Sequence, residues 1–192
     1  MAGSLANNRS LSVRVGAGTL GSRRIRAPRG SDIRPTPERA RLALFSILGN
    51  RVVDARFLDL YAGSGAVGFE ALSRGAREVV FVEADARTAA SLRATAENFG
   101  VADRVMVMRA DASHIASRLR GRFDLVFADP PFAQAAPYQA LESLRACGRL
   151  DARSLIMYER RHSAPAFACP GWRSERTERY GEVALEFLRF DG

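Results

Sequence analysis

Between residues 56 and 160, apolar runs of strand length alternate with segments of helical spacing, and this alternation is the strongest constraint on the fold. Runs such as V-V-F-V and D-L-V-F-A are almost continuously apolar, which is typical of strands covered on both faces. We therefore expect a Rossmann-like α/β fold with a mostly parallel sheet. Strands are predicted at 56–61, 78–83, 104–109, 123–128 and 154–160, and helices at 66–74, 85–99, 112–120 and 137–147.

The end of the chain has a different pattern. Two strand-like runs, 172–180 and 183–190, are joined by Tyr180-Gly181-Glu182. A link of this length is too short for the crossover that parallel strands need. We expect a C-terminal antiparallel hairpin that closes one edge of the sheet and brings it to seven strands.

Composition is consistent with one domain and gives no sign of export. At 192 residues and 47% hydrophobic, the chain can bury a full core. No run approaches the roughly 18 apolar residues that a membrane span needs, and the first ten residues hold no apolar signal-peptide core. We expect a cytoplasmic monomer with no membrane partner. Cys147 and Cys169 have no metal-ligand spacing, so no metal is expected.

Almost all of the excess positive charge lies in the first quarter of the chain. Residues 1–50 carry nine arginines against two acids, a net charge of +7, whereas residues 51–192 are close to neutral. Such a run is often only a solvated surface, but a basic segment beside a neutral globule is also a footprint for phosphates. The expected RNA-binding residues are Arg23, Arg24, Arg26, Arg34 and Thr36.

These charges suggest three parts of the chain. Residues 1–12 are expected to be a disordered tail, 13–50 a basic N-terminal extension, and 51–192 the α/β domain. Within the extension, residues 13–28 predict a short hairpin or loop. A helix is expected to follow, with Thr36 as N-cap and Pro37 at the first helical position, and Gly49-Asn50 would end it.

The segment Gly63-Ser64-Gly65-Ala66-Val67-Gly68 matches G-x-G-x-x-G, and Glu83 follows twenty residues after Gly63. This is the fingerprint of a dinucleotide site, so an NAD-dependent oxidoreductase is one interpretation. Asp59, four residues before Gly63, argues against it because its carboxylate would face the anionic pyrophosphate. S-adenosylmethionine carries a sulfonium, an ammonium and no phosphate, so it suits Asp59. The alternative is that Asp59 is a satisfied strand-end carboxylate.

The other residues of a donor site follow from the same reasoning. Glu83 could accept hydrogen bonds from both ribose hydroxyls. Asp111, after the third strand, could accept from the adenine amine, could be a helix N-cap, or could be both. The expected cofactor-binding residues are Asp59, Tyr61, Ala62, Gly63, Ser64, Gly65, Glu83, Ala84, Asp111 and Ala112.

Asp129-Pro130-Pro131-Phe132 follows the fourth strand, at the edge where open α/β sheets bind ligands. An ordinary turn is the alternative. The prolines donate no N–H, so their carbonyls remain free, and with Asp129 they could hold an exocyclic amine while Phe132 stacks on the base. Positioning and electrostatics would then suffice for methyl transfer. A C5 pyrimidine methylase would need a cysteine in this loop, and none is there.

The core resembles the class I S-adenosylmethionine methyltransferases, in which Asp129–Phe132 would be a variant of the [DN]-P-P-[YFW] loop that serves adenine-N6, cytosine-N4 and guanine-N2 enzymes. From about residue 13 onward, the chain is similar to the RsmD family of 16S ribosomal RNA guanine-N2 methyltransferases. The similarity is carried by G-A-G-T-L-G-S-R-R-I-R-A-P, R-P-T-P-E-R-A-R-L-A-L-F-S-I-L and L-D-L-Y-A-G-S-G-A-V-G. This chain differs from that family at Gly21-Ser22, Leu42 and Ser46, where Arg-Gly, glutamate and asparagine are usual.

This resemblance implies methyl transfer from S-adenosylmethionine to the N2 amine of a guanine in small-subunit ribosomal RNA, alone or within a 30S particle. It places Asp129, Pro130, Pro131 and Phe132 at the base. We expect Arg34 and Thr36 to border the mouth of the active site as well. An enzyme for another RNA, a DNA adenine methyltransferase and an inactive RNA-binding or assembly factor remain alternatives beside the oxidoreductase.

Overall fold

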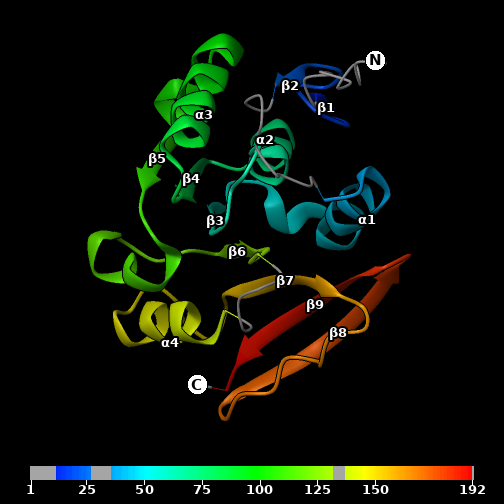
Figure 1. The fold of residues 1–192 in the computed structure, drawn as a ribbon, viewed down its shortest axis with the longest axis vertical. Coiled ribbons are helices and arrows are strands. Elements are labelled where there is room, and N and C mark those ends of the chain that lie inside the picture. Colours follow the sequence, from blue (N-terminus) through cyan, green and yellow to red (C-terminus); the bar gives the residue numbers. More distant parts are fainter. Residues whose placement is uncertain (1–11, 27–35, 132–136, 192) are drawn as a thin grey trace, which may run out of the picture.

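The computed structural model describes residues 12–26, 36–131 and 137–191. Of the expected tail 1–12, residues 1–11 lie outside them, and Ser12 begins a strand. A seven-stranded sheet has the order β5-β4-β3-β6-β7-β9-β8. Its parallel part contains β3 (Arg56–Asp59), β4 (Glu78–Glu83), β5 (Val105–Arg109), β6 (Leu125–Ala128) and β7 (Leu155–Arg161). The antiparallel hairpin of β8 (Trp172–Tyr180) and β9 (Val183–Phe190) closes the β7 side (Figure 1). The expected fold is confirmed.

The two faces of the sheet are covered by different elements. Helices α1 (Glu38–Leu48), α2 (Ala66–Ser73) and α3 (Ala86–Phe99) pack on one face, which contains Phe57. The other face, with Leu58, is covered by α4 (Tyr138–Ala146) and two short turns, η3 (Ala112–His114) and η4 (Ala116–Arg118). Neighbouring residues of a strand thus enter opposite cores, which explains the continuous apolar runs. In the part of the chain that the structure describes, no helix is long and apolar enough to span a membrane.

The prediction of a helix at 112–120 is wrong, because the chain forms the two 3₁₀ turns η3 and η4 instead. Apolar residues at helical spacing do bury here, but the backbone becomes extended at Leu119. The guanidinium of Arg56 then donates to the carbonyls of Arg120 and Arg122 and holds the chain away from a helical path. The long-range contact from β3 therefore overrides the local periodicity.

The N-terminal extension contains the expected hairpin, with β1 (Ser12–Arg14) paired antiparallel to β2 (Arg24–Arg26). Val15 and Ile25 bury their side chains in the same core as α1 and α2. Helix α1 begins at Glu38, and Pro37 rather than Thr36 occupies the N-cap position, without a side-chain cap. The Thr36 cap is therefore wrong. Two 3₁₀ segments, η1 (Gly49–Val52) and η2 (Ala102–Arg104), precede β3 and β5.

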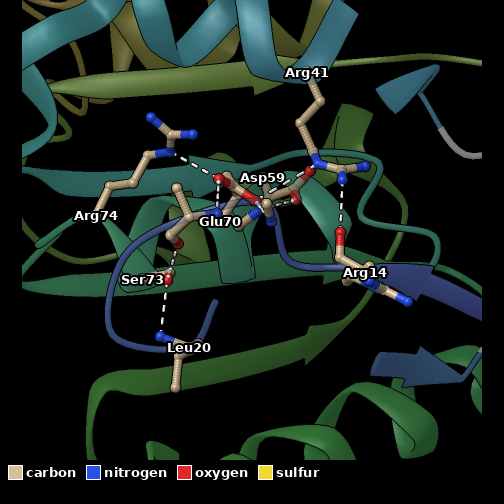
Figure 2. A network of polar contacts seen from close by, with 10 residues as sticks. Arg14, Leu20, Arg41, Asp59, Glu70, Ser73 and Arg74 are labelled. Atoms are coloured by element: carbon tan, nitrogen blue, oxygen red, sulfur yellow. Dashed lines mark hydrogen bonds and ion pairs between the residues drawn. The ribbon is translucent and has the colours of Figure 1, made fainter. Parts of the chain in front are cut away.

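A buried carboxylate on α2 attaches this extension to the sheet domain. Glu70 is fully buried, and it accepts hydrogen bonds from the N–H groups of Gly16 (2.6 Å) and Ala17 (3.2 Å). Figure 2 shows Arg74 and Arg41 approaching it from two sides, with Nε–O distances of 2.7 and 3.7 Å. The extension is thus held to α2 through a carboxylate that is itself fully buried.

Arg41 and Ser73 complete the attachment. The guanidinium of Arg41 is buried and donates from Nη2 to the carbonyl of Arg14 (2.7 Å), and burial lowers its pKa. The Ser73 hydroxyl accepts from the N–H of Leu20 (2.9 Å) and donates to the carbonyl of Ala17. These contacts join α1, α2 and the hairpin in one polar network (Figure 2).

Replacing Glu70 with alanine is expected to destabilise the protein by about 3–5 kcal/mol, because it leaves the buried Arg41 without its counter-charge. The free energy of unfolding, measured by urea denaturation, tests this. Glu97→Ala, an exposed acid on α3, is the matched control and should change stability by less than about 0.5 kcal/mol. Equal effects of the two substitutions would contradict the assigned role of Glu70.

Candidate active site

The candidate site lies at the carboxyl ends of β3 and β6, where the order of the strands reverses. From β3, the chain continues to β4 and β5 on one side of the sheet and later returns to β6 and β7 on the other. Ligands of open α/β sheets bind in the crevice at such a switch point. The turn that contains Gly63 and the loop that begins at Asp129 both start there. Spacing in the sequence predicted both positions, and the topology brings them together.

Asp59, at the end of β3, is fully buried and accepts a hydrogen bond from the N–H of Gly68 (3.1 Å). Burial, together with the charges of Asp129 and Glu83, raises the pKa of its carboxyl to about 7, against the opposing effect of that hydrogen bond. A buried carboxylate in this position is costly to ionise unless a cation lies next to it. Asp59 thus holds the start of α2, and the negative charge of its carboxylate is costly at this site.

The turn after β3 needs glycine for two different reasons. Gly63 and Gly65 adopt left-handed backbone angles, with φ of +50° and +77°. At Gly68, a Cβ atom would lie 2.2 Å from the ring of Phe81, so α2 can pack on β4 only without a side chain there. Glycine is therefore required at 63 and 65 by the backbone angles and at 68 by the close packing of α2 on the Phe81 ring.

Glu83 ends β4 beside this turn, as its spacing from Gly63 predicted. Its carboxylate accepts from the N–H groups of Gly63 (2.9 Å) and Asp85 (2.8 Å), which ties the glycine turn to β4. The side chain is half-buried, and each carboxylate oxygen can accept a second hydrogen bond. Glu83 therefore keeps capacity for two hydroxyl donors.

Asp111 follows β5 and caps η3, accepting from the backbone N–H (2.8 Å) and the hydroxyl (2.6 Å) of Ser113. These hydrogen bonds lower the pKa of its carboxyl. The cap is confirmed, and contact with adenine stays a prediction. Tyr61 is half-buried, and burial, with the charge of Asp111, raises its pKa to about 12. The remaining expected donor-site residues lie along the same loops, with Ala62, Ser64 and Ala112 buried and Ala84 exposed.

Asp129 and Pro130 begin the loop after β6. Asp129 is half-buried and Pro130 is buried, and burial raises the pKa of the Asp129 carboxyl above its usual range. Pro131 is exposed. Phe132 lies outside the described residues, so its stacking role stays a prediction.

The sequence analysis missed Glu159 on β7. This residue is 4% exposed, and its Oε2 atom has no hydrogen-bond partner among the described residues. The side chain of Thr36 hydrogen-bonds the Glu159 carboxylate, and burial together with the charge of Asp129 raises the pKa of Glu159. An acid near the end of the apolar run L-I-M-Y-E was the one available signal, because such a strand tolerates buried charge poorly.

The expected RNA-binding residues differ in their exposure and in their contacts. Arg24 and Arg26 are exposed on the hairpin, as phosphate contacts require. Arg23 donates to the carbonyl of Phe99 (2.7 Å) and lies over its ring, so it also holds the end of α3. Thr36 is buried beside Glu159, and Arg34 lies outside the described residues. No three His, Cys, Asp or Glu side chains within these described ranges are arranged to hold a metal ion.

Comparison with known proteins gives consistent matches along the chain. A family model described as Conserved hypothetical protein 95 matches residues 13–189. Ribosomal RNA small subunit methyltransferase D of Escherichia coli K12 is 31% identical over 178 residues, which are 92% of this chain and 89% of that protein. The solved structure of the Escherichia coli protein yhhF superposes with a TM-score of 0.83 at 28% identity, covering 95% of this chain and 99% of that one.

A more distant structure shares the fold. An RNA methyltransferase from Salinibacter ruber, solved in complex with S-adenosyl-L-homocysteine, superposes with a TM-score of 0.59 at 18% identity. The matched region covers 80% of this chain and 92% of that one.

The raised pKa of Asp59 predicts how stability depends on pH. Because the folded protein holds this proton up to about pH 7 while the unfolded chain releases it near 3.8, the contribution of Asp59 to stability is largest below pH 3.8 and is lost as pH rises toward 7. Asp59→Asn keeps an acceptor for Gly68 and should lose less stability than the wild type between pH 4 and 8. Denaturant unfolding across this range tests the difference, and parallel pH profiles would contradict it.

Proposed function

Because the chain belongs to the RsmD family, described as conserved hypothetical protein 95, we propose that it is an S-adenosylmethionine-dependent methyltransferase of small-subunit ribosomal RNA. The acceptor that we propose is the exocyclic N2 amine of a guanine in 16S ribosomal RNA. The relative from Escherichia coli, which aligns with 92% of this chain, carries the small-subunit ribosomal RNA activity in its name. The choice of guanine N2 rests on the resemblance in sequence.

One observation carries the proposal: β3 and β6 are neighbouring parallel strands in which Asp59 pairs with Phe127, so Asp59 and Asp129 lie close together at the carboxyl ends of adjacent strands. The first ends β3 at the glycine turn, and the second begins the loop with two prolines after β6. A site for a cationic donor and a site for an amine are thus adjacent. Methyl transfer requires this adjacency, because the nitrogen must lie in line with the methyl group.

The residues present fit S-adenosylmethionine. When bound, that molecule supplies a methyl group on a positively charged sulfur. Asp59 is buried and electrostatically unsatisfied, so a cationic ligand would favour its charged form. Glu83, which already holds the N–H of Gly63, would accept from the ribose hydroxyls.

The amine would be held by Asp129 and the carbonyl of Pro130. Both accept hydrogen bonds, so they orient the N–H bonds of the amine and raise the electron density on its nitrogen. The nitrogen must lose a proton after it gains the methyl group. Burial raises the pKa of Asp129, which suits its carboxylate to take up that proton. Phe132 would stack on the base after it leaves its helix.

The same electrostatics argue against the oxidoreductase. The pyrophosphate of NAD would enter a site that already holds Asp59, Glu83 and Asp129, and the first two raise the cost of negative charge beside the glycine turn. The basic extension 13–50 adds a surface for polyanions instead. We propose that Arg24 and Arg26, exposed on its hairpin, contact RNA phosphates.

Asp129→Ala is expected to lower the rate of methyl transfer by at least about 10²-fold and to leave donor binding intact, because it removes an acceptor from the amine site. The measurement is transfer from labelled S-adenosylmethionine into unmodified 30S particles and protein-free 16S RNA. Nucleoside mass spectrometry then identifies the product, and fragment mapping locates the guanine. Asp103→Ala, an exposed acid in η2, is the control and should keep full activity.

The outcomes of this experiment separate the alternatives. Label in N2-methylguanosine supports the proposed reaction and shows which form of RNA is accepted. Label in another nucleoside keeps the methyltransferase and overturns the guanine assignment. A protein that binds ribosomal RNA but transfers no label would be an RNA-binding or assembly factor, and label in DNA only would indicate the DNA adenine enzyme.

Replacing Arg24 and Arg26 with alanine should weaken RNA binding and make log K less dependent on log salt concentration. The slope should fall by about 0.7–0.9 for each phosphate that the variant no longer neutralises. The weakening should be similar for unrelated RNA sequences, because phosphate contacts do not read bases. Binding titrations between 50 and 200 mM salt test this. Arg122→Ala, an exposed arginine just before β6, is the control, and an equal effect there would contradict a role specific to the hairpin.

A further inference from the structure

Glu159 presents a buried acceptor atom, Oε2, that no donor among the described residues reaches. The residue is 4% exposed, and Oε2 has no hydrogen-bond partner among the described residues. The side chain of Thr36 binds the carboxylate and holds it in place. A buried polar atom without a partner costs free energy, so one that persists in a folded site points to a ligand that completes it.

The sheet places this acceptor beside the proposed amine site. In the register of β6 and β7, Ala128 pairs with Tyr158, so Asp129 and Glu159 are the next residues along neighbouring parallel strands. Such strands lie about 4.8 Å apart. Two residues earlier, Phe127 and Met157 both enter the core under α1 and α2, and Thr36 reaches Glu159 from just before α1. The charge of Asp129 raises the pKa of Glu159, which agrees with their proximity.

Two neighbouring carboxylates distinguish among the bases that carry an exocyclic amine. In adenine, the N6 amine lies next to N1, which is an acceptor, and in cytosine the N4 amine lies next to N3, also an acceptor. In guanine, the N2 amine lies next to N1–H, which is a donor. A second carboxylate beside the amine site therefore complements guanine and repels the lone pairs of the other two bases.

Building on the proposed function, we propose that Oε2 of Glu159 accepts the N1–H of the target guanine while Asp129 holds the N2 amine, so that Glu159 selects guanine over adenine and cytosine. Thr36 is then a positioning residue that fixes the Glu159 carboxylate. The N–H donor of the base would favour the charged form of Glu159 and remove the cost of its unpartnered oxygen. Sites built to bind a substrate N–H or O–H reject analogues that lack it by large factors.

The test replaces the mapped guanine by 2-aminopurine, which keeps the 2-amine but has an acceptor at N1. The base is introduced by ligating a synthetic segment into 16S RNA, which is assembled into 30S particles if only these are methylated. The wild type should methylate guanine at least about 10²-fold faster than 2-aminopurine, as kcat/KM. Glu159→Gln can turn its amide N–H toward N1, so its preference for guanine should fall at least tenfold, with a gain on 2-aminopurine.

Glu182→Gln, exposed in the β8–β9 turn, is the matched control and should keep the wild-type preference. The gain on 2-aminopurine is the decisive readout, because neither a purely structural role nor the missing O6 of the analogue would produce it. An unchanged preference in Glu159→Gln overturns the inference. Equal rates of the wild type on both bases overturn it too, without reference to any variant. Failure of the proposed function would appear separately, as no N2-methylguanosine from the wild type on unsubstituted RNA.

Discussion

The carboxylate of Glu70 lies in the interior of the molecule, and the position of the whole N-terminal extension depends on how it is satisfied. Burying a charge is costly unless hydrogen bonds and opposite charges surround it, and here they come from two backbone N–H groups of the extension, from Arg74 and from Arg41. Because α2 also begins at the glycine turn, the same helix carries both the attachment of the basic hairpin and the start of the candidate donor site. The part proposed to bind RNA and the part proposed to bind the donor therefore share one rigid element.

A second group of carboxylates lies at the carboxyl edge of the same sheet face, where Asp59 accepts a hydrogen bond from Gly68 and Glu159 accepts one from Thr36. Asp59, Asp129 and Glu159 all have raised pKa values, with burial as the main cause, and Oε2 of Glu159 has no partner among the described residues. Glu70 shows that this protein can satisfy a buried acid when only stability is required. The contrast fits a site whose missing partners are a cation and the N–H donors of a base.

The parts that local pattern could predict are those in which neighbouring residues decide the outcome. Strand β4 and the C-terminal hairpin lie at their expected bounds, and Asp111 caps its turn, which was one of its two interpretations. The helix at 112–120 and the Thr36 cap failed because distant groups intervene: Arg56 holds the carbonyls after η4, and Glu159 takes the Thr36 side chain. Local propensity cannot register a partner that is 60 or more residues away.

By itself, the sequence determined the class of fold and the positions of Asp59, Glu83 and Asp129 at strand ends. It could do so because periodicity, glycine turns and strand ends are local properties of a chain. Only the tertiary structure decided which acids are satisfied and which are not. Glu70 and Glu159 each follow apolar residues in the sequence, and those preceding residues do not distinguish the two acids. Their difference arises because folding brings N–H groups and guanidinium groups to Glu70, whereas it brings Glu159 to a second carboxylate at the switch point of the sheet.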